Sequence, residues 1–158
     1  MPPSKTRVLF VCVHNSARSQ MAEAFLGHLA GGTFEVDSAG IEPGTLNPLV
    51  VEAMKEVGID ISRNETKSVF ALLAQGRSYD YVVTVCDESQ AAACPVFPGT
   101  AATRRLHWGF EDPSAFQGTG EERLRQTRLV RDAIGNRVAE WLAEIRRRPE
   151  PTALGSGG

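Results

Sequence analysis

Residues 8–19 read Val8-Leu9-Phe10-Val11-Cys12-Val13-His14-Asn15-Ser16-Ala17-Arg18-Ser19. The four apolar residues at the start are typical of a buried parallel strand, and a helical pattern begins near Ser19. A loop that leaves such a strand and enters a helix directs its backbone N–H groups into one concavity, where the helix dipole adds about half a positive charge. The sequence therefore predicts a cradle for an anion between the strand and the helix.

Two side chains give the predicted cradle its chemistry. Arg18 carries a planar guanidinium group whose donors suit two oxygens of a tetrahedral oxyanion. Cys12 lies at the floor of the cradle, where the positive potential favours the nucleophilic thiolate, and Ser19 is placed to hydrogen-bond that thiolate. The alternative is a buried structural cysteine with an unrelated surface arginine. We take Cys12 and Arg18 as catalytic, and we assign oxyanion binding to Val13, His14, Asn15, Ser16, Ala17, Arg18 and Ser19, with His14 acting through its backbone.

The bulk properties describe one ordinary globular domain. The 158 residues are enough for a proper core, and the Pro-, Gly- and Ser-rich end predicts a folded domain over 1–148 followed by a disordered tail over 149–158. Apolar residues make up 42% and charged residues 23% of the chain, as in soluble proteins. The net charge of −2 gives no reason to expect a nucleic acid or an anionic membrane as a partner. We expect a monomer.

The apolar runs and the cysteines indicate the compartment. The first apolar run is too short for a secretory signal or a membrane span. The cysteine count of 3 is odd, which argues against an extracellular scaffold held together by disulfides. These features predict a cytoplasmic protein whose cysteines are catalytic, redox-active or simply buried.

Short apolar runs alternate with helical patterns along the chain. They predict strands at 7–11, 34–38, 79–85 and 104–108, and helices at 19–29, 47–58, 68–73 and from 119 onward. This alternation predicts a single α/β domain, a doubly wound, four-stranded parallel sheet with helices on both faces. The buried face of the last helix is expected to consist of Leu124, Leu129, Ala133, Val138, Trp141, Leu142 and Ile145. Ligands of such sheets bind beyond the carboxyl ends of the strands, so Cys12 and Cys86, which each follow a strand, are expected on the same rim.

Cys86 and Cys94 bracket an alanine-rich segment. If this segment unwinds, the two sulfurs can approach to the roughly 2 Å of a disulfide. Otherwise they are two unrelated buried cysteines. The spacing does not match that of a zinc site, and only His107 is near at hand, so no metal is expected.

A general acid is the component that the cradle itself lacks. Asp112 follows the segment His107-Trp108-Gly109-Phe110-Glu111, where aromatic residues flank it, and Pro113 restricts its backbone. An Asp-Pro pair often marks only a turn, and Glu111 is a competing acid. Asp112 is the best-placed group to protonate a leaving oxygen.

Together these motifs resemble the low-molecular-weight protein tyrosine phosphatases and, more closely, the thioredoxin-coupled arsenate reductases on the same fold. The resemblance spans most of residues 7–145 and is carried by residues 11–23, 38–42, 47–48, 52–57, 82–86, 94–95 and 107–113. The chain departs from the phosphatases at Ser114-Ala115-Phe116, where they have a tyrosine pair, and at Ala17, where they often have a second loop cysteine. The segment between Cys86 and Cys94 is one residue longer than in the reductases.

The resemblance implies a mechanism. Cys12 attacks arsenate, Asp112 protonates the departing oxygen, and Arg18 holds the charge. Cys86 then attacks the Cys12 sulfur, so that arsenite leaves. Cys94 attacks Cys86 in turn, and the resulting Cys86–Cys94 disulfide is reduced by thioredoxin. Phosphate and sulfate are expected to compete with arsenate for the cradle.

Some of these reductases hold potassium beside the loop through Asn, Glu, Ser and Asp side chains. Asn15, Glu23 and Ser38 match those ligands, whereas Lys67 stands at the position of the Asp. We expect the Lys67 ammonium group to replace the cation. No tightly bound cofactor is therefore expected, and thioredoxin is the expected electron donor.

Two other functions stay open. A phosphomonoester hydrolase would need only Cys12, Arg18 and Asp112, and the other cysteines would be incidental. A non-catalytic oxyanion-binding module or arsenic sensor would need no general acid. Redox dependence of turnover separates the reductase from the hydrolase, and turnover of any kind separates both from the sensor.

Overall fold

The computed structural model describes residues 5–86 and 103–147. Its sheet contains four parallel strands in the order β2-β1-β3-β4, with bounds β1 Thr6–Cys12, β2 Phe34–Gly40, β3 Tyr81–Thr84 and β4 Arg104–His107. The helices are α1 Arg18–Ala30, α2 Pro48–Glu56, α3 Val69–Ala74 and α4 Gly120–Arg147, with short 3₁₀ turns η1 Gly31–Thr33 and η3 Pro113–Ala115. The predicted α/β fold class is confirmed. Within the described residues no helix is long and apolar enough to cross a membrane.

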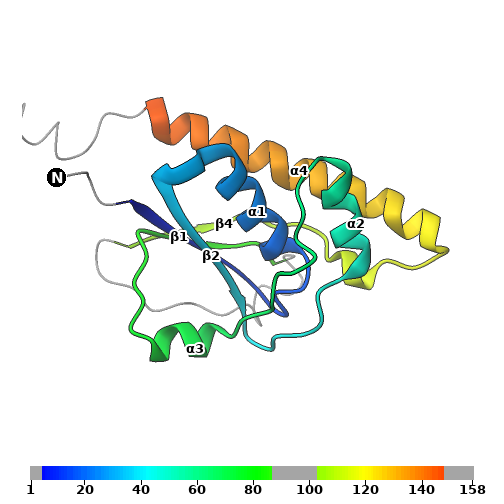
Figure 1. Ribbon diagram of the computed structural model, residues 1–158, viewed down its shortest axis with the longest axis horizontal. Helices are drawn as coiled ribbons and strands as arrows, with labels where there is room; N and C mark the ends of the chain where they lie inside the picture. The colour runs from blue at the N-terminus through cyan, green and yellow to red at the C-terminus, as the bar shows by residue number, and fades with distance from the viewer. Residues whose placement is uncertain (1–4, 87–102, 148–158) are drawn as a thin grey trace, which may run out of the picture.

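The central strand β1 is buried on both faces because helices cover both sides of the sheet (Figure 1). Successive residues of a strand point to opposite faces. Val8 and Phe10 accordingly pack into a core with α1, α2 and α4, whereas Leu9 and Val11 pack into a second core against α3. This two-sided burial explains the continuous apolar run that identified the strand in the sequence.

Two predicted helix starts are confirmed by side-chain caps. The Asn47 Oδ1 atom accepts a hydrogen bond of 2.9 Å from the Leu49 N–H, and Pro48 occupies the first helical position of α2. At the start of α4, the Glu122 N–H donates to the Thr119 hydroxyl over 3.1 Å. Both caps satisfy N–H groups that have no partner inside the helix.

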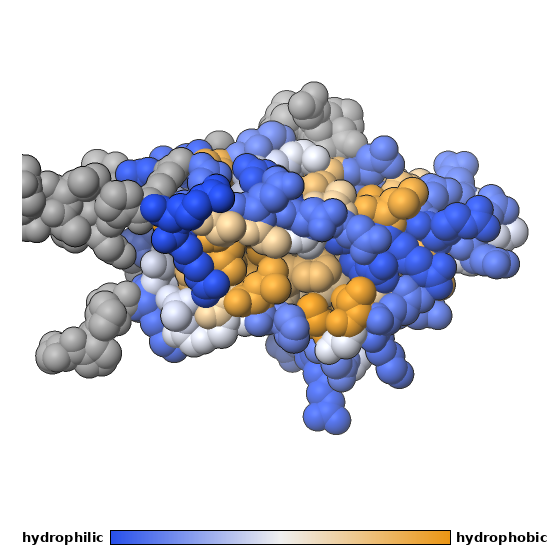
Figure 2. All heavy atoms as spheres, turned by 90° about the horizontal axis from the view of Figure 1, so that it is seen from above, coloured by the Kyte–Doolittle hydropathy of each residue, from blue (hydrophilic) through white to orange (hydrophobic). Residues whose placement is uncertain are grey.

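The predicted buried face of α4 is partly wrong. Leu129 is 68% exposed and Ala133 is exposed as well. Thr127 and Arg131 take buried positions instead, because Thr127 donates to the Arg123 carbonyl over 2.7 Å and Arg131 is bonded to α2. The buried face of α4 also includes two apolar residues that were not predicted, Val130 and Ile134. Figure 2 views the molecule from above relative to Figure 1, and on this face a group of apolar residues is surrounded by hydrophilic ones.

A charged cluster joins α2 to α4. Arg128 binds both carboxylate oxygens of Glu56, at 2.6 Å from Nη2 and 2.8 Å from Nε. Arg131 Nη1 donates to Glu56 at 2.8 Å and to the Ala53 carbonyl at 2.9 Å. The hydrogen bond from Arg128, with that from Arg131, lowers the pKa of Glu56 to about 2.

This lowered pKa gives a pH-dependent contribution to stability. The contribution is fully present above the ordinary Glu pKa of 4.5 and is lost as the pH falls toward about 2. We expect Glu56→Gln to lower the urea midpoint at neutral pH, and the gap from wild type to shrink at about pH 3. Unfolding curves at both pH values measure this gap. An equal difference in urea midpoint at the two pH values would contradict this pH dependence of stability.

An aromatic cluster anchors the segment that follows β4. The Trp108 ring lies 5.9 Å from Phe10 and 5.8 Å from Trp141, between centroids, and Tyr81 lies 5.1 Å from Trp141. The Arg137 guanidinium group lies 4.6 Å above the Trp108 ring, in a cation–π geometry. The packing of Trp108 thus anchors the segment that leads from β4 to Asp112.

Candidate active site

The loop between β1 and α1 lies at the carboxyl edge of the sheet, as predicted (Figure 1). Cys12 ends β1 and is 2% exposed. Its sulfur lies 3.1 Å from the Asn15 backbone nitrogen, which donates to it, and 2.9 Å from the Ser19 hydroxyl. The predicted contact between Cys12 and Ser19 is thus present.

The side chain of Asn15 determines the direction of the Ser19 hydroxyl. Asn15 is fully buried with φ of 53°, in the left-handed region, and its Oδ1 accepts from the Lys67 N–H at 2.8 Å and from Gln20 Nε2 at 3.1 Å. With Oδ1 fixed as the acceptor, Nδ2 donates to the Ser19 oxygen over 2.8 Å. The Ser19 hydrogen is therefore left for the Cys12 sulfur.

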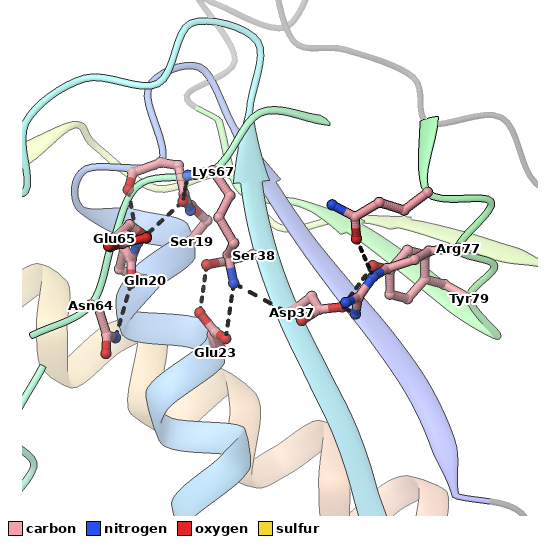
Figure 3. A network of polar contacts seen from close by, with 12 residues as sticks. Ser19, Gln20, Glu23, Asp37, Ser38, Asn64, Glu65, Lys67, Arg77 and Tyr79 are labelled. Atoms are coloured by element: carbon pink, nitrogen blue, oxygen red, sulfur yellow. Dashed lines mark hydrogen bonds and ion pairs between the residues drawn. The ribbon is translucent and has the colours of Figure 1, made fainter. Parts of the chain in front are cut away.

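Gln20 is a part of this arrangement that the sequence analysis missed. It is 1% exposed, and Nε2 also donates to the Asn15 carbonyl and to the Glu65 carbonyl, each at 3.1 Å. Its own carbonyl oxygen accepts from Asn64 over 3.1 Å (Figure 3). No local pattern reveals the contacts with Asn64 and Glu65, because these partners lie 44 and 45 residues away.

The structure brings Arg18 and Asp112 together, as predicted. The Arg18 side chain is 2% exposed, and its Nη2 lies 3.5 Å from the Asp112 Oδ2 atom. Its Nη1 donates to the Phe110 carbonyl over 3.1 Å, a contact that the sequence did not predict. Glu111, the competing acid, has an exposed side chain. Asp112 is therefore the acid that faces the loop.

The segment after β2 binds the outer side of the loop. The carbonyls of Val13 and Ser16 accept from the N–H groups of Glu42 and Asn47, at 2.9 and 3.0 Å. The His14 ring also lies on this side, with Nδ1 3.0 Å from the Glu42 carbonyl, and Nδ1 carries the proton because a carbonyl oxygen only accepts. The His14 ring therefore contacts the segment after β2, and the role of the His14 backbone in binding an oxyanion stays a prediction. With these carbonyls directed outward, the loop N–H groups are free to face an anion.

Gly40 is where β2 approaches the loop most closely. A Cβ atom there would lie 2.6 Å from the Val13 oxygen and 2.8 Å from the Asn15 nitrogen, both backbone atoms. Gly40→Ala must therefore displace the loop, and we expect the affinity for inorganic phosphate, measured by calorimetry, to fall by about 100-fold. The matched control is Gly27→Ala, where nothing lies within 4 Å of the new Cβ. Equal affinities in the two variants would show that the loop tolerates the displacement.

Lys67 lies in a cluster of acids beside the loop (Figure 3). Its ammonium nitrogen is 3.7 Å from Glu23 Oε2 and 4.0 Å from Asp37 Oδ1. The Ser38 hydroxyl donates to the other Glu23 oxygen over 2.6 Å, and the Tyr79 hydroxyl donates to Asp37 over 2.7 Å. Burial raises the pKa of Glu23, and the charge of Lys67 opposes that effect. Asp37 was not among the predicted residues.

Cys86 lies directly beyond β3 and is fully buried. The Val85 N–H donates to the Val11 carbonyl over 2.9 Å, so Cys86 lies beyond the end of β3, about one residue past the level of Cys12 at the end of β1. Cys86 takes part in a disulfide, whereas Cys12 is a free thiol. Cys94 lies outside the described residues. Within residues 5–86 and 103–147, no group of three or more His, Cys, Asp and Glu side chains could hold a metal ion.

Known proteins with similar sequences and structures are named arsenate reductases. A relative from Bacillus subtilis, "Arsenate reductase", is 46% identical over 134 residues, which are 85% of this chain and 93% of the relative. A solved "arsenate reductase in the phosphate binding state" matches with TM-score 0.71 and 33% identity, over 89% of this chain and 98% of the other. The "thioredoxin-dependent arsenate reductase Cg_ArsC1'" of Corynebacterium glutamicum matches with TM-score 0.65 and 30% identity, over 90% of this chain and 62% of the other.

A family model also matches most of the chain. The model of the low molecular weight phosphotyrosine protein phosphatases matches residues 7–150. The match contains the loop that begins at Cys12, the β3 end with Cys86, and the acid segment with Asp112. The chain therefore belongs to the low molecular weight phosphotyrosine protein phosphatase family.

Proposed function

We propose that this protein is an arsenate reductase, which converts arsenate to arsenite through a relay of Cys12, Cys86 and Cys94 that thioredoxin regenerates. The proposal is carried by one observation: a nucleophilic thiol in an oxyanion loop lies beside a second cysteine on the neighbouring strand. Five relatives named arsenate reductase are 42% to 46% identical to this chain. The dependence on thioredoxin is supported by the name of the Corynebacterium relative.

The first step resembles phosphoryl transfer, because arsenate has the shape and charge of phosphate. The Cys12 thiolate attacks arsenic, and a bond to one oxygen breaks as Asp112 gives that oxygen a proton. The loop N–H groups and the guanidinium group of Arg18 hold the remaining oxygens and stabilise their charge in the transition state. The product is an arsenic(V) adduct on the Cys12 sulfur.

The second step transfers two electrons. The Cys86 thiolate attacks the Cys12 sulfur, a disulfide forms between them, and the electron pair of the broken sulfur–arsenic bond stays on arsenic, which leaves as arsenite. Parallel strands lie roughly 4.8 Å apart, so the neighbouring ends of β1 and β3 bring the two cysteines to the same part of the sheet edge. Cys94 then attacks Cys86, and Cys12 departs as a thiolate. Thioredoxin reduces the Cys86–Cys94 disulfide.

The relay requires a reducing compartment. A disulfide that forms in each cycle must be reduced in each cycle, so we propose the cytoplasm as the site of action. The catalytic unit is a monomer of the 1–148 domain, and the tail over 149–158 takes no part in the relay. Phosphate and sulfate compete with arsenate because the loop recognises tetrahedral geometry and charge.

The deciding experiment measures arsenate-dependent NADPH oxidation by the reduced protein with thioredoxin and thioredoxin reductase. Hydrolysis of para-nitrophenyl phosphate is measured alongside. We expect NADPH oxidation that requires both arsenate and thioredoxin, together with slow ester hydrolysis. Hydrolysis without arsenate turnover would make the protein a phosphomonoester hydrolase, and the absence of both activities would leave an oxyanion-binding module.

We propose that the Lys67 ammonium group takes the place of a potassium ion beside the loop. Its charge lies between Glu23 and Asp37, and its backbone N–H holds the Asn15 side chain. Exchange of sodium for potassium at constant ionic strength is expected to change arsenate turnover by less than about twofold. Lys67→Ala is expected to lower turnover and to recover part of it with potassium. A several-fold activation of the wild-type protein by potassium would contradict the proposal.

A further inference from the structure

We infer that Asn47 and Ser114 are positioning residues that hold the general acid Asp112 in register with the oxyanion loop. The inference rests on the proposed function, because it assumes that Asp112 protonates the leaving oxygen. Asn47 begins α2 and contacts both sides of the site. Its backbone N–H donates to the Ser16 carbonyl of the loop over 3.0 Å, and its side chain donates to the Ser114 hydroxyl over 3.1 Å.

The orientation of the Asn47 amide follows from its role as a helix cap. The Leu49 N–H donates to Oδ1, so Oδ1 is the acceptor and Nδ2 is the group that faces the Ser114 oxygen. Asn47 thus uses three groups at once: one for the loop, one for α2 and one for the turn after Asp112. Serine at this position keeps the cap but is too short to reach Ser114.

Ser114 in turn determines which oxygen of Asp112 faces the loop. The Ser114 N–H donates to Asp112 Oδ1 over 3.0 Å, and Asp112 thereby caps the η3 turn. The other oxygen, Oδ2, faces Arg18 at 3.5 Å. A shift of the Ser114 backbone would rotate the carboxyl group and move the proton that Oδ2 delivers.

The ion pair with Arg18 cannot supply this positioning during turnover. The Arg18 guanidinium group binds two oxygens of the bound anion, so its ion pair with Asp112 changes when an anion occupies the loop. The contact between Asn47 and Ser114 involves neither the anion nor a charged group. We expect it to tie the acid to the loop in the same way before and after the anion binds.

The test compares two esters whose leaving groups differ in basicity, para-nitrophenyl phosphate and phenyl phosphate. Only the strongly basic phenolate needs full protonation, so a misplaced acid penalises phenyl phosphate selectively. In Ser114→Ala and in Asn47→Ser, we expect kcat/KM for phenyl phosphate to fall about threefold to tenfold, and that for the nitrophenyl ester to fall less than about twofold. The double variant is expected to be no worse than either single variant.

A matched control is Ser62→Ala. The Ser62 N–H donates to Asp60 Oδ1 over 2.9 Å, the same turn geometry as at Asp112, on an exposed part of the chain. We expect no change for either ester. Equal losses for both esters, or losses that multiply in the double variant, would overturn the inference and leave a structural contact only.

A reference variant separates failure of the inference from failure of the proposed function. Asp112→Asn is expected to show the same selectivity at larger amplitude. Without that selectivity, Asp112 is not the acid, and the inference fails with its premise. Selective losses in a protein that lacks arsenate turnover would retain the positioning role and refute the reductase function.

Discussion

Cys86→Ser is expected to abolish steady-state arsenate reduction, by about a thousandfold or more, and to leave para-nitrophenyl phosphate hydrolysis within about twofold. The arsenic adduct can still form on Cys12, but no thiol remains to take the sulfur–arsenic electron pair onto arsenic. Hydrolysis needs only the loop, Arg18 and Asp112. The measurement is NADPH oxidation coupled through thioredoxin.

Cys94→Ser separates the two thiol exchanges. Steady-state turnover is lost here too, because no Cys94 thiol remains to attack the Cys12–Cys86 disulfide and release Cys12. One arsenite per protein is nevertheless released when the reduced variant meets arsenate without thioredoxin, whereas Cys86→Ser releases none. A colorimetric count of arsenite in a single turnover distinguishes them. Sustained turnover in either variant would refute the relay, and loss of hydrolysis in Cys86→Ser would show that this cysteine supports the loop structurally.

Arg18→Lys is expected to lower both arsenate reduction and ester hydrolysis by about 100-fold to 1,000-fold. The guanidinium group donates to the Phe110 carbonyl and lies 3.5 Å from Asp112 while 2% exposed, and it must still present two donors to the anion. Lysine keeps the charge but offers a point donor without the planar fork, so it cannot meet all three demands. The loss is read as kcat/KM for each reaction.

The matched control for this substitution is Arg128→Lys. Arg128 binds Glu56 at the surface with a similar two-oxygen contact, and its side chain is 41% exposed. Both activities are expected to be unchanged there. A loss below about tenfold in Arg18→Lys would mean that charge alone, and not the shape of the guanidinium group, holds the oxyanion.

The oxyanion loop and the fold could be predicted from sequence because their signals are local. The run before Cys12 is apolar throughout since helices cover both faces of β1, and the Asn47-Pro48 cap acts within three residues. The contact of Ser19 with Cys12 likewise spans only seven residues, across the loop that joins β1 to α1. Each of these features depends on neighbours along the chain, which a sequence displays directly.

The missed residues depend on contacts that only the tertiary structure creates. Asp37 meets Lys67 across 30 positions, and Gln20 reaches Glu65 across 45, with no periodic pattern linking either pair. The exposed Leu129 shows the converse error. Leu129 and its neighbour Val130 are both apolar, so the sequence alone does not decide which of them faces the core, and the structure buries Val130.

The packing of Trp108 against Trp141 gives the protein an optical reporter of its own. These residues are both of the 2 tryptophans in the chain, and their rings lie 5.8 Å apart at 65°. Near-ultraviolet circular dichroism depends on such fixed aromatic packing. Because Trp108 precedes Asp112 by four residues, a rearrangement of the acid segment during the redox cycle would register in this spectrum without any attached label.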